Sequence, residues 1–159
     1  MNLISTVVGI GFLAMTVGAG ISYVNPAARS VTETMALINA GFQGLSQAYL
    51  SRQMTGAPAL DPASWKSALF PAYGFEPKAP SGASWSYGAD VNGRWFCLAA
   101  PRADRVMRAA IDGAGRQYSA ASYLISGACG RAPAAAPTGA AGVSGDSVAA
   151  TLWLSREVP

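Results

Sequence analysis

The residues of this chain best suited to covalent or metal chemistry are its two cysteines, Cys97 and Cys129. They lie far apart in the sequence, form no Cys-x-x-Cys motif and have no histidine to join them, so a zinc site is not expected. In an exported domain, two cysteines most simply form one disulfide, which at this loop length would stabilise the fold by about 3–4 kcal/mol. Two buried free thiols are the alternative.

The other polar residues do not indicate a catalytic site. Serine, threonine and tyrosine are present, but the chain has no histidine to act as their general base. The aspartates are scattered among small residues, with no reason for any two to converge as an acid/base pair: Asp90, Asp104, Asp112 and Asp146. Gly113–Gly115 follows a predicted helix, so it indicates a helix stop and not a phosphate loop. We therefore expect no enzyme, no metal site and no cofactor.

Two sets of side chains could bind a partner at the surface. The first is a row of arginines at every third residue of a predicted helix, namely Arg102, Arg105 and Arg108. This row could meet an anionic partner or a neighbouring subunit's carboxylate, or it could be a solvated helix face. The second set is aromatic and comprises Tyr73, Phe75, Trp85 and Tyr87. It could form a ligand patch, or a satellite core under a proline-rich loop.

The charge composition also bears on the partners. Charged residues make up 12% of the 159-residue chain and the net charge is +3. An ordinary soluble domain carries roughly twice that share of charged residues. Low charge is typical of a protein whose surface is covered by neighbours, and also of an alanine-rich chain. Because the basic residues are scattered, no nucleic-acid site is evident.

A long apolar segment precedes the elements that would position these side chains. The first 28 residues carry no charge, and Leu3 to Val24 predict one helix that is long enough to cross a bilayer. The absence of a basic start and the length of the apolar run favour a retained helix, over residues 1–26, instead of a cleaved signal peptide. Small residues recur every four positions and would let another helix approach closely, although they are common in any membrane helix: Ala14, Gly18 and Ser22.

A second, amphipathic helix is predicted over residues 27–53. Its apolar positions are spaced by four and three residues in turn, which gives a continuous stripe: Val31, Met35, Ile38, Phe42, Leu45 and Tyr49. The stripe is expected to pack on the chain's own sheet as a core face. The alternative is a seam against other copies, and both hold if the helix is sandwiched.

The remainder, residues 54–159, predicts one small α+β domain. Asp61 and Pro62 would start a short helix that includes residues 65–70, a second helix is expected over 102–112 with Gly113 as its stop, and Asp90–Gly93 indicates a hairpin turn. Strands are predicted at residues 84–87, 94–98, 118–126 and 147–158. The expected fold is therefore a long N-terminal helix, membrane-spanning in its first half, packed on a small antiparallel sheet.

This layout resembles the type IV pilins. The start Met1-Asn2-Leu3-Ile4 is similar to the mature end of the type IVb branch. The segments 95–98 and 126–130, which contain the two cysteines and flank a predicted helix, are similar to the disulfide region of those pilins and of conjugative thin-pilus proteins. The resemblance covers the whole architecture, through motifs of moderate specificity.

The resemblance implies a structural filament subunit, major or minor. Residues 3–24 would hold it in the bacterial inner membrane with a periplasmic domain, until assembly machinery transfers it to an extracellular pilus of its own copies or other pilins. The pilus would support adhesion, motility or DNA transfer. The pairing of Cys97 with Cys129 and an assembly role for the N-terminal helices fit this reading.

One position departs from the family pattern. Most pilins carry a glutamate at mature position five that pairs with a neighbour's N-terminal amine, whereas this chain has Ser5, whose neutral hydroxyl cannot form that charge pair. Some minor pilins also lack the acid. The alternative is therefore a membrane-anchored accessory protein of a pilus or secretion machine. Whether Met1 is an initiator or a processed end separates the two readings.

Overall fold

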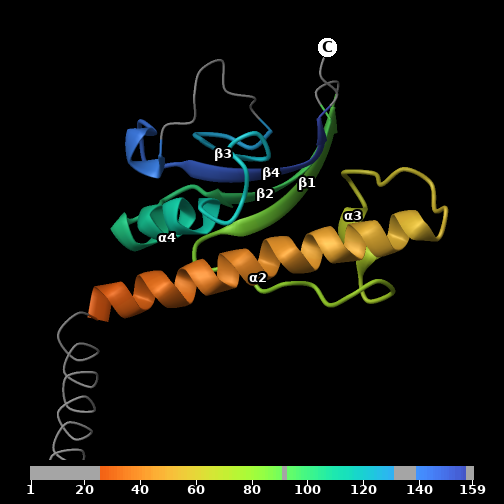
Figure 1. Cartoon of the computed structure of the whole chain (residues 1–159), viewed down its shortest axis with the longest axis horizontal. Coiled ribbons are helices and arrows are strands. Elements are labelled where there is room, and N and C mark those ends of the chain that lie inside the picture. The colour runs from red at the N-terminus through yellow and green to blue at the C-terminus, as the bar shows by residue number, and fades with distance from the viewer. Residues whose placement is uncertain (1–25, 91–92, 131–138, 157–159) are drawn as a thin grey trace, which may run out of the picture.

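One long helix crosses one face of a four-stranded antiparallel sheet (Figure 1). The computed structural model describes residues 26–90, 93–130 and 139–156. In chain order the elements are α2 (Pro26–Met54), α3 (Trp65–Leu69), β1 (Ser84–Asp90), β2 (Gly93–Ala100), α4 (Arg105–Gly115), β3 (Tyr123–Ser126), η1 (Ala140–Gly142) and β4 (Val148–Arg156). This part of the chain confirms the expected α+β class, with a long helix on a small antiparallel sheet.

The helix α2 matches the amphipathic helix expected over residues 27–53. It begins at Pro26, whose fixed φ and missing N–H suit a first helical turn. Most of its apolar stripe is buried inside the chain: Ile38, Phe42, Leu45 and Tyr49. Val31 and Met35, nearer the start of the helix, are half-buried against the same core. The stripe is thus a core face of this domain, as the first of the two interpretations predicted.

The sheet places the C-terminal strand in its interior. The strand order is β1-β2-β4-β3, and the predicted hairpin is present, with β1 and β2 paired from Ser84↔Ala99 to Asp90↔Gly93. Because side chains alternate across a strand, Phe96 and Leu98 of β2 face α2 and Cys97 faces the other side. The strand β3 pairs with residues 149–152 of β4, so β4 continues past the end of its neighbour.

Both short helices begin later than expected, for local reasons. The helix α3 starts at Trp65 because the Asp61 carboxylate accepts a hydrogen bond from the Ala63 backbone N–H (3.0 Å), in the turn that precedes it. The helix α4 starts at Arg105 because Asp104 is its N-cap, and its carboxylate accepts from the Met107 backbone N–H at 2.8 Å. The strand expected over residues 118–126 forms only at 123–126, after a run of turns.

The prediction that Gly113 stops its helix is wrong, since α4 continues to Gly115. A Cβ atom at position 113 would lie 2.7 Å from the Met35 sulfur of α2. Gly113 therefore lies inside the helix because it lets α2 and α4 pack closely. A glycine within a helical pattern can therefore mark a close packing contact as well as the end of the helix.

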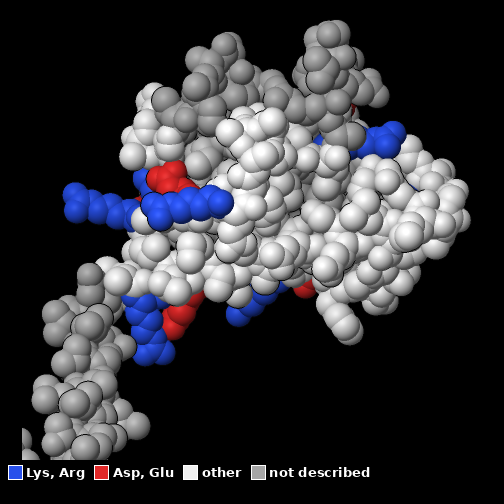
Figure 2. Space-filling model, in the orientation of Figure 1, with Lys and Arg blue, Asp and Glu red and all other residues white. Residues whose placement is uncertain are grey.

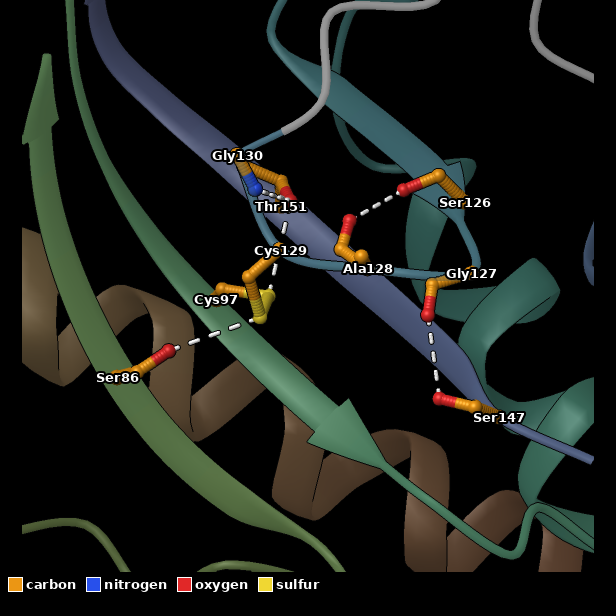
Figure 3. Close-up of a disulfide and its surroundings, with 9 residues drawn as sticks. All are labelled: Ser86, Cys97, Ser126, Gly127, Ala128, Cys129, Gly130, Ser147 and Thr151. Atoms are coloured by element: carbon orange, nitrogen blue, oxygen red, sulfur yellow. Dashed lines mark hydrogen bonds between the residues drawn. A yellow bond between two sulfur atoms is a disulfide. The ribbon is translucent and has the colours of Figure 1, made fainter.

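The predicted disulfide is present on the sheet face away from α2. Cys97 on β2 is bonded to Cys129 in the segment after β3, with Ser86 of β1 and Thr151 of β4 beside the bond (Figure 3). The Gly130 backbone N–H donates to the Thr151 hydroxyl oxygen at 3.1 Å, which ties the same segment to β4. The bond thus fastens residues 127–130 across the central strands.

Residues 1–25 lie outside the part of the chain that the structure describes, and so does the predicted membrane helix. Ser5, Ala14, Gly18 and Ser22 fall in this segment, and their expected assembly role stays a prediction. Among the described residues, no helix is both long and apolar enough to span a bilayer.

Candidate interaction surface

Two of the four aspartates singled out in the sequence, Asp104 and Asp112, bind backbone N–H groups through their side chains. Asp104 caps α4, and the Asp112 carboxylate accepts from the Ala140 backbone N–H at 2.6 Å. Burial raises the pKa of Tyr87 to about 12 and raises the pKa of Tyr123 as well, so both phenols stay protonated at neutral pH. Across the described residues, no cluster of three or more histidine, cysteine, aspartate or glutamate side chains could hold a metal ion.

The row of arginines that begins before α4 and continues into it does not act as one surface. Arg102 and Arg105 are exposed, but Arg108 is half-buried and binds backbone carbonyls. Its guanidinium donates to Ala140 O (2.7 Å), Val143 O (3.2 Å) and Ala103 O (3.3 Å), and also to Gly145 O. Arg108 therefore fixes the segment around η1 to α4 and is not part of an anion site.

Replacing Arg108 by alanine is expected to lower the free energy of unfolding by about 2–3 kcal/mol, because four backbone carbonyls, most of them part-buried, would lose a charged donor. Arg108→Lys should recover only part of this loss, since an ammonium group cannot span the same set of acceptors. Arg105→Ala, at an exposed position of the same helix, is the matched control and should change stability by less than about 0.5 kcal/mol. Chemical denaturation of the three variants measures these differences, and equal effects for Arg105→Ala and Arg108→Ala would contradict the assignment.

The aromatic set divides between core and surface. Trp85 and Tyr87 are buried in the core under α2, where Phe42 meets the Trp85 ring edge-on at a centroid distance of 4.9 Å. Tyr73 is half-buried and packs against that core. Phe75 differs, because its side chain is 92% exposed. The set is therefore a core with one exposed member and does not form a single ligand patch.

The exposed side of α2 carries no charge along most of the helix. From Thr34 to Ser51 the helix has no charged residue. We call its exposed and half-exposed positions opposite the core the outer face of α2: Ala36, Leu37, Ala40, Gln43, Gly44, Gln47 and Ser51. In Figure 2 a broad uncharged band follows α2, and the charged atoms in view gather mainly at its edges. A charge-free strip that includes several small residues, here Ala36, Ala40 and Gly44, is typical of a helix that packs against another helix.

Two glycines of α2 show which of its sides lacks a partner. A Cβ atom on Gly41 would lie 2.1 Å from Cζ2 of Trp85, so Gly41 makes room for the sheet. A Cβ atom on Gly44 would have nothing within 4 Å. Glycine inside a helix costs about 1 kcal/mol relative to alanine. Contacts within the described chain account for Gly41, but they do not account for Gly44.

A cleft opens beside the C-terminal half of α2, where β4 extends past β3. It encloses about 360 Å³, and we call it the α2–β4 cleft; its lining is Ser46, Tyr49, Leu50, Gln53, Arg94, Tyr118, Ser122, Leu152, Trp153 and Leu154. Three side chains of the lining are joined: the Tyr49 hydroxyl oxygen accepts from Gln53 Nε2 (2.7 Å) and from Arg94 Nη1 (3.3 Å). The cleft is therefore mainly apolar, with a polar edge that carries one cation.

Sequence reasoning named the core stripe but missed the surface next to it. The assembly residues Ile38, Phe42, Leu45 and Tyr49 are buried in their own domain, so a neighbour of this folded domain would meet the outer face of α2 instead. The uncharged run from Thr34 to Ser51 was the available signal. The α2–β4 cleft gave no signal, because its residues come from four separate stretches of the chain.

Comparison with known proteins returns no match for this chain. No protein-family model matches it, and no curated protein or solved structure does so. The resemblance to type IVb pilins thus stays an expectation from the sequence.

Proposed function

We propose that this protein is a structural subunit of a type IVb-like pilus, major or minor, which assembles through its N-terminal helices. The observation that carries the proposal is the uncharged outer face of α2, with Gly44 in open space. A surface helix normally exposes charged residues, and an unpacked glycine weakens it. Both features are accounted for if the neighbouring subunit supplies the missing contacts.

The position of α2 in the chain supports the same function. The helix begins at Pro26, directly after a segment of the sequence without charge, and its inner face is occupied by the sheet. A subunit of this shape is held at the bilayer before assembly and packs beside its copies through the outer face of α2 afterwards. The helix is then sandwiched between its own sheet and a neighbour.

The disulfide is consistent with an exported location. Disulfides persist in oxidising compartments such as the periplasm and the cell surface. The Cys97–Cys129 bond lies in the domain that would be periplasmic before assembly and on the outside of the filament afterwards. The proposed partners are other copies of the chain or related pilins, the inner membrane and the machinery that moves subunits into the filament.

The variant Gly44→Leu tests the function in the full-length chain expressed in its native host. The folded subunit should become more stable by roughly 0.5–1 kcal/mol, because leucine is a better helix former and the site is open. The amount recovered in sheared filaments should fall at least about tenfold, because the larger side chain blocks a close approach worth about 1.4 kcal/mol or more. Immunodetection in the filament and membrane fractions measures this.

Two outcomes would decide against the proposed function. If the wild-type chain occurs only in the membrane fraction and never in sheared filaments, it is an anchored accessory protein. If Gly44→Leu enters filaments as well as the wild type does, the outer face of α2 is not the contact surface. Gly41→Ala is the matched control, since it should reduce the amount of folded protein through the clash with Trp85 and leave Gly44 untouched.

A further inference from the structure

The two cysteines of the disulfide lie in different surroundings. Cys97 is fully buried in the central strand β2, whereas Cys129 is half-buried in the segment that follows β3. The two residues before Cys129 in that segment, Gly127 and Ala128, are exposed. A thiol of another molecule therefore reaches the bond from the side of Cys129, because an approach to the Cys97 sulfur requires the strands of the sheet to separate.

Each sulfur atom accepts a hydrogen bond from a hydroxyl group of a neighbouring strand (Figure 3). The Thr151 hydroxyl donates to Cys97 Sγ at 3.6 Å, and the Ser86 hydroxyl donates to Cys129 Sγ at 3.6 Å. The sheet fixes both hydroxyl groups, because Ser86, Cys97 and Thr151 are register partners on three adjacent strands. Since a hydrogen bond to the charged form of a group favours that form, each hydroxyl is placed to stabilise a thiolate.

The hydroxyl group of Thr151 is oriented by the backbone. Its oxygen accepts a hydrogen bond from the Gly130 N–H at 3.1 Å. A hydroxyl group has a single proton to donate, and here that proton is directed to Cys97 Sγ. Thr151 and Cys97 are both fully buried. A thiolate on Cys97 would therefore form away from water, where a hydrogen bond to a charged atom is strongest.

We infer that thiol–disulfide exchange at this bond uses Cys129 as the attacked sulfur and Cys97 as the leaving sulfur, with the Thr151 hydroxyl stabilising the leaving thiolate. An external thiolate forms a bond to Cys129 Sγ, the Cys97–Cys129 bond breaks, and its electron pair stays on Cys97 Sγ. A second external thiolate then attacks the external sulfur and releases Cys129. The products are one external disulfide and two cysteine thiols, which take up the protons of the two external thiols.

The reverse reaction forms the bond. A disulfide of another molecule is attacked first by the Cys129 thiolate, which gives a mixed disulfide and releases one external thiolate. The Cys97 thiolate then attacks Cys129 Sγ, so that the Cys97–Cys129 bond forms and the second external thiolate leaves. An oxidant of this class thus needs access to Cys129 alone, after the sheet that holds Cys97 has formed. The inference goes beyond the filament function and does not depend on it.

Glutathione, a small thiol, tests the order of attack on the full-length wild-type chain in detergent. After a brief reaction, free thiols are blocked with N-ethylmaleimide, and mass spectrometry of the peptides locates the attached glutathione. We expect at least about tenfold more glutathione on Cys129 than on Cys97. The same reaction in concentrated urea is the control, in which this excess should disappear. Equal amounts on the two cysteines of the folded chain, an excess on Cys97, or no adduct at concentrations that reduce the unfolded chain would overturn the inference.

Variants of Thr151 separate the effect of its hydroxyl group from a structural role. Thr151→Val removes the hydroxyl and should slow formation of the Cys129 adduct about threefold or more, because a less stabilised thiolate leaves more slowly. Thr151→Ser keeps the hydroxyl and should restore the wild-type rate. Ser86→Ala should leave this step unchanged, since its hydroxyl donates to the sulfur that does not leave. A merely structural role would loosen the sheet and speed the reaction, so a rate of Thr151→Val at or above that of the wild type would overturn the role of Thr151.

Discussion

Replacing Phe42 by alanine is expected to lower the free energy of unfolding by about 3–5 kcal/mol, which is a large part of the stability of a small domain. Phe42 is fully buried at the centre of the core. Its ring meets Trp85 edge-on (4.9 Å between centroids) and also contacts Tyr123 (5.7 Å) and Tyr118 (6.1 Å). Truncation would leave a cavity between α2, the sheet and the turns after α4, and rigid rings on three sides cannot collapse into it.

Equilibrium denaturation of the full-length chain in detergent, followed by tryptophan fluorescence, measures this loss. Gln43→Ala is the matched control, because it lies next to Phe42 on the exposed side of α2 and should change stability by less than about 0.5 kcal/mol. If Phe42→Ala folds with unchanged stability and only assembly fails, Phe42 contributes to a contact between subunits and the core described here is incorrect.

The elements with a strong local pattern could be predicted from the sequence. The alternating spacing of apolar residues located α2 to within one or two residues, because a helix buries one face at that period. The pair Asn92-Gly93 indicated the β1–β2 hairpin, and Gly93 lies at the start of β2, where it pairs with Asp90. The Cys97–Cys129 pairing followed from the number of cysteines once export was assumed.

The boundaries that failed depend on contacts between distant parts of the chain. Gly113 has the composition of a helix stop, and only the approach of Met35 explains why α4 continues through it. Arg108 belongs to a regular row of arginines, but the return of residues 140–145 to α4 gives it a structural role. Neither partner is close in sequence, so local spacing could not identify either contact.

The candidate surface shows the same division. The outer face of α2 could have been predicted, because an uncharged run of that length is a property of the sequence itself. The α2–β4 cleft was not, because it depends on β3 ending at Ser126 while β4 continues to Arg156. The exposure of Phe75 could not be predicted, because the other three aromatic residues of its set lie in the core or pack on it.

Removing the disulfide is the second change with a large expected effect. The bond joins residues separated by 32 positions, and in the chain-entropy model a loop of that length stabilises the folded state by about 3–4 kcal/mol. The double variant Cys97→Ala with Cys129→Ala should lose stability by that amount. Alanine is the suitable replacement, because Cys97 is fully buried and a serine hydroxyl would add the cost of an unpaired polar group.

The loss should fall mainly on the sheet face that α2 does not cover. Without the bond, residues 127–130 are held to the central strands by hydrogen bonds such as Gly130 N–H to the Thr151 hydroxyl oxygen. Hydrogen exchange should therefore rise first at Gly130 and β3, and the core residue Phe42 on the opposite face should keep its protection until global unfolding. Loss of protection in α2 at the same rate would show that the disulfide holds the whole domain and not this face. A decrease in unfolding free energy below about 1 kcal/mol would show that residual structure in the unfolded chain already brings the two cysteines together, so that closing the loop costs little.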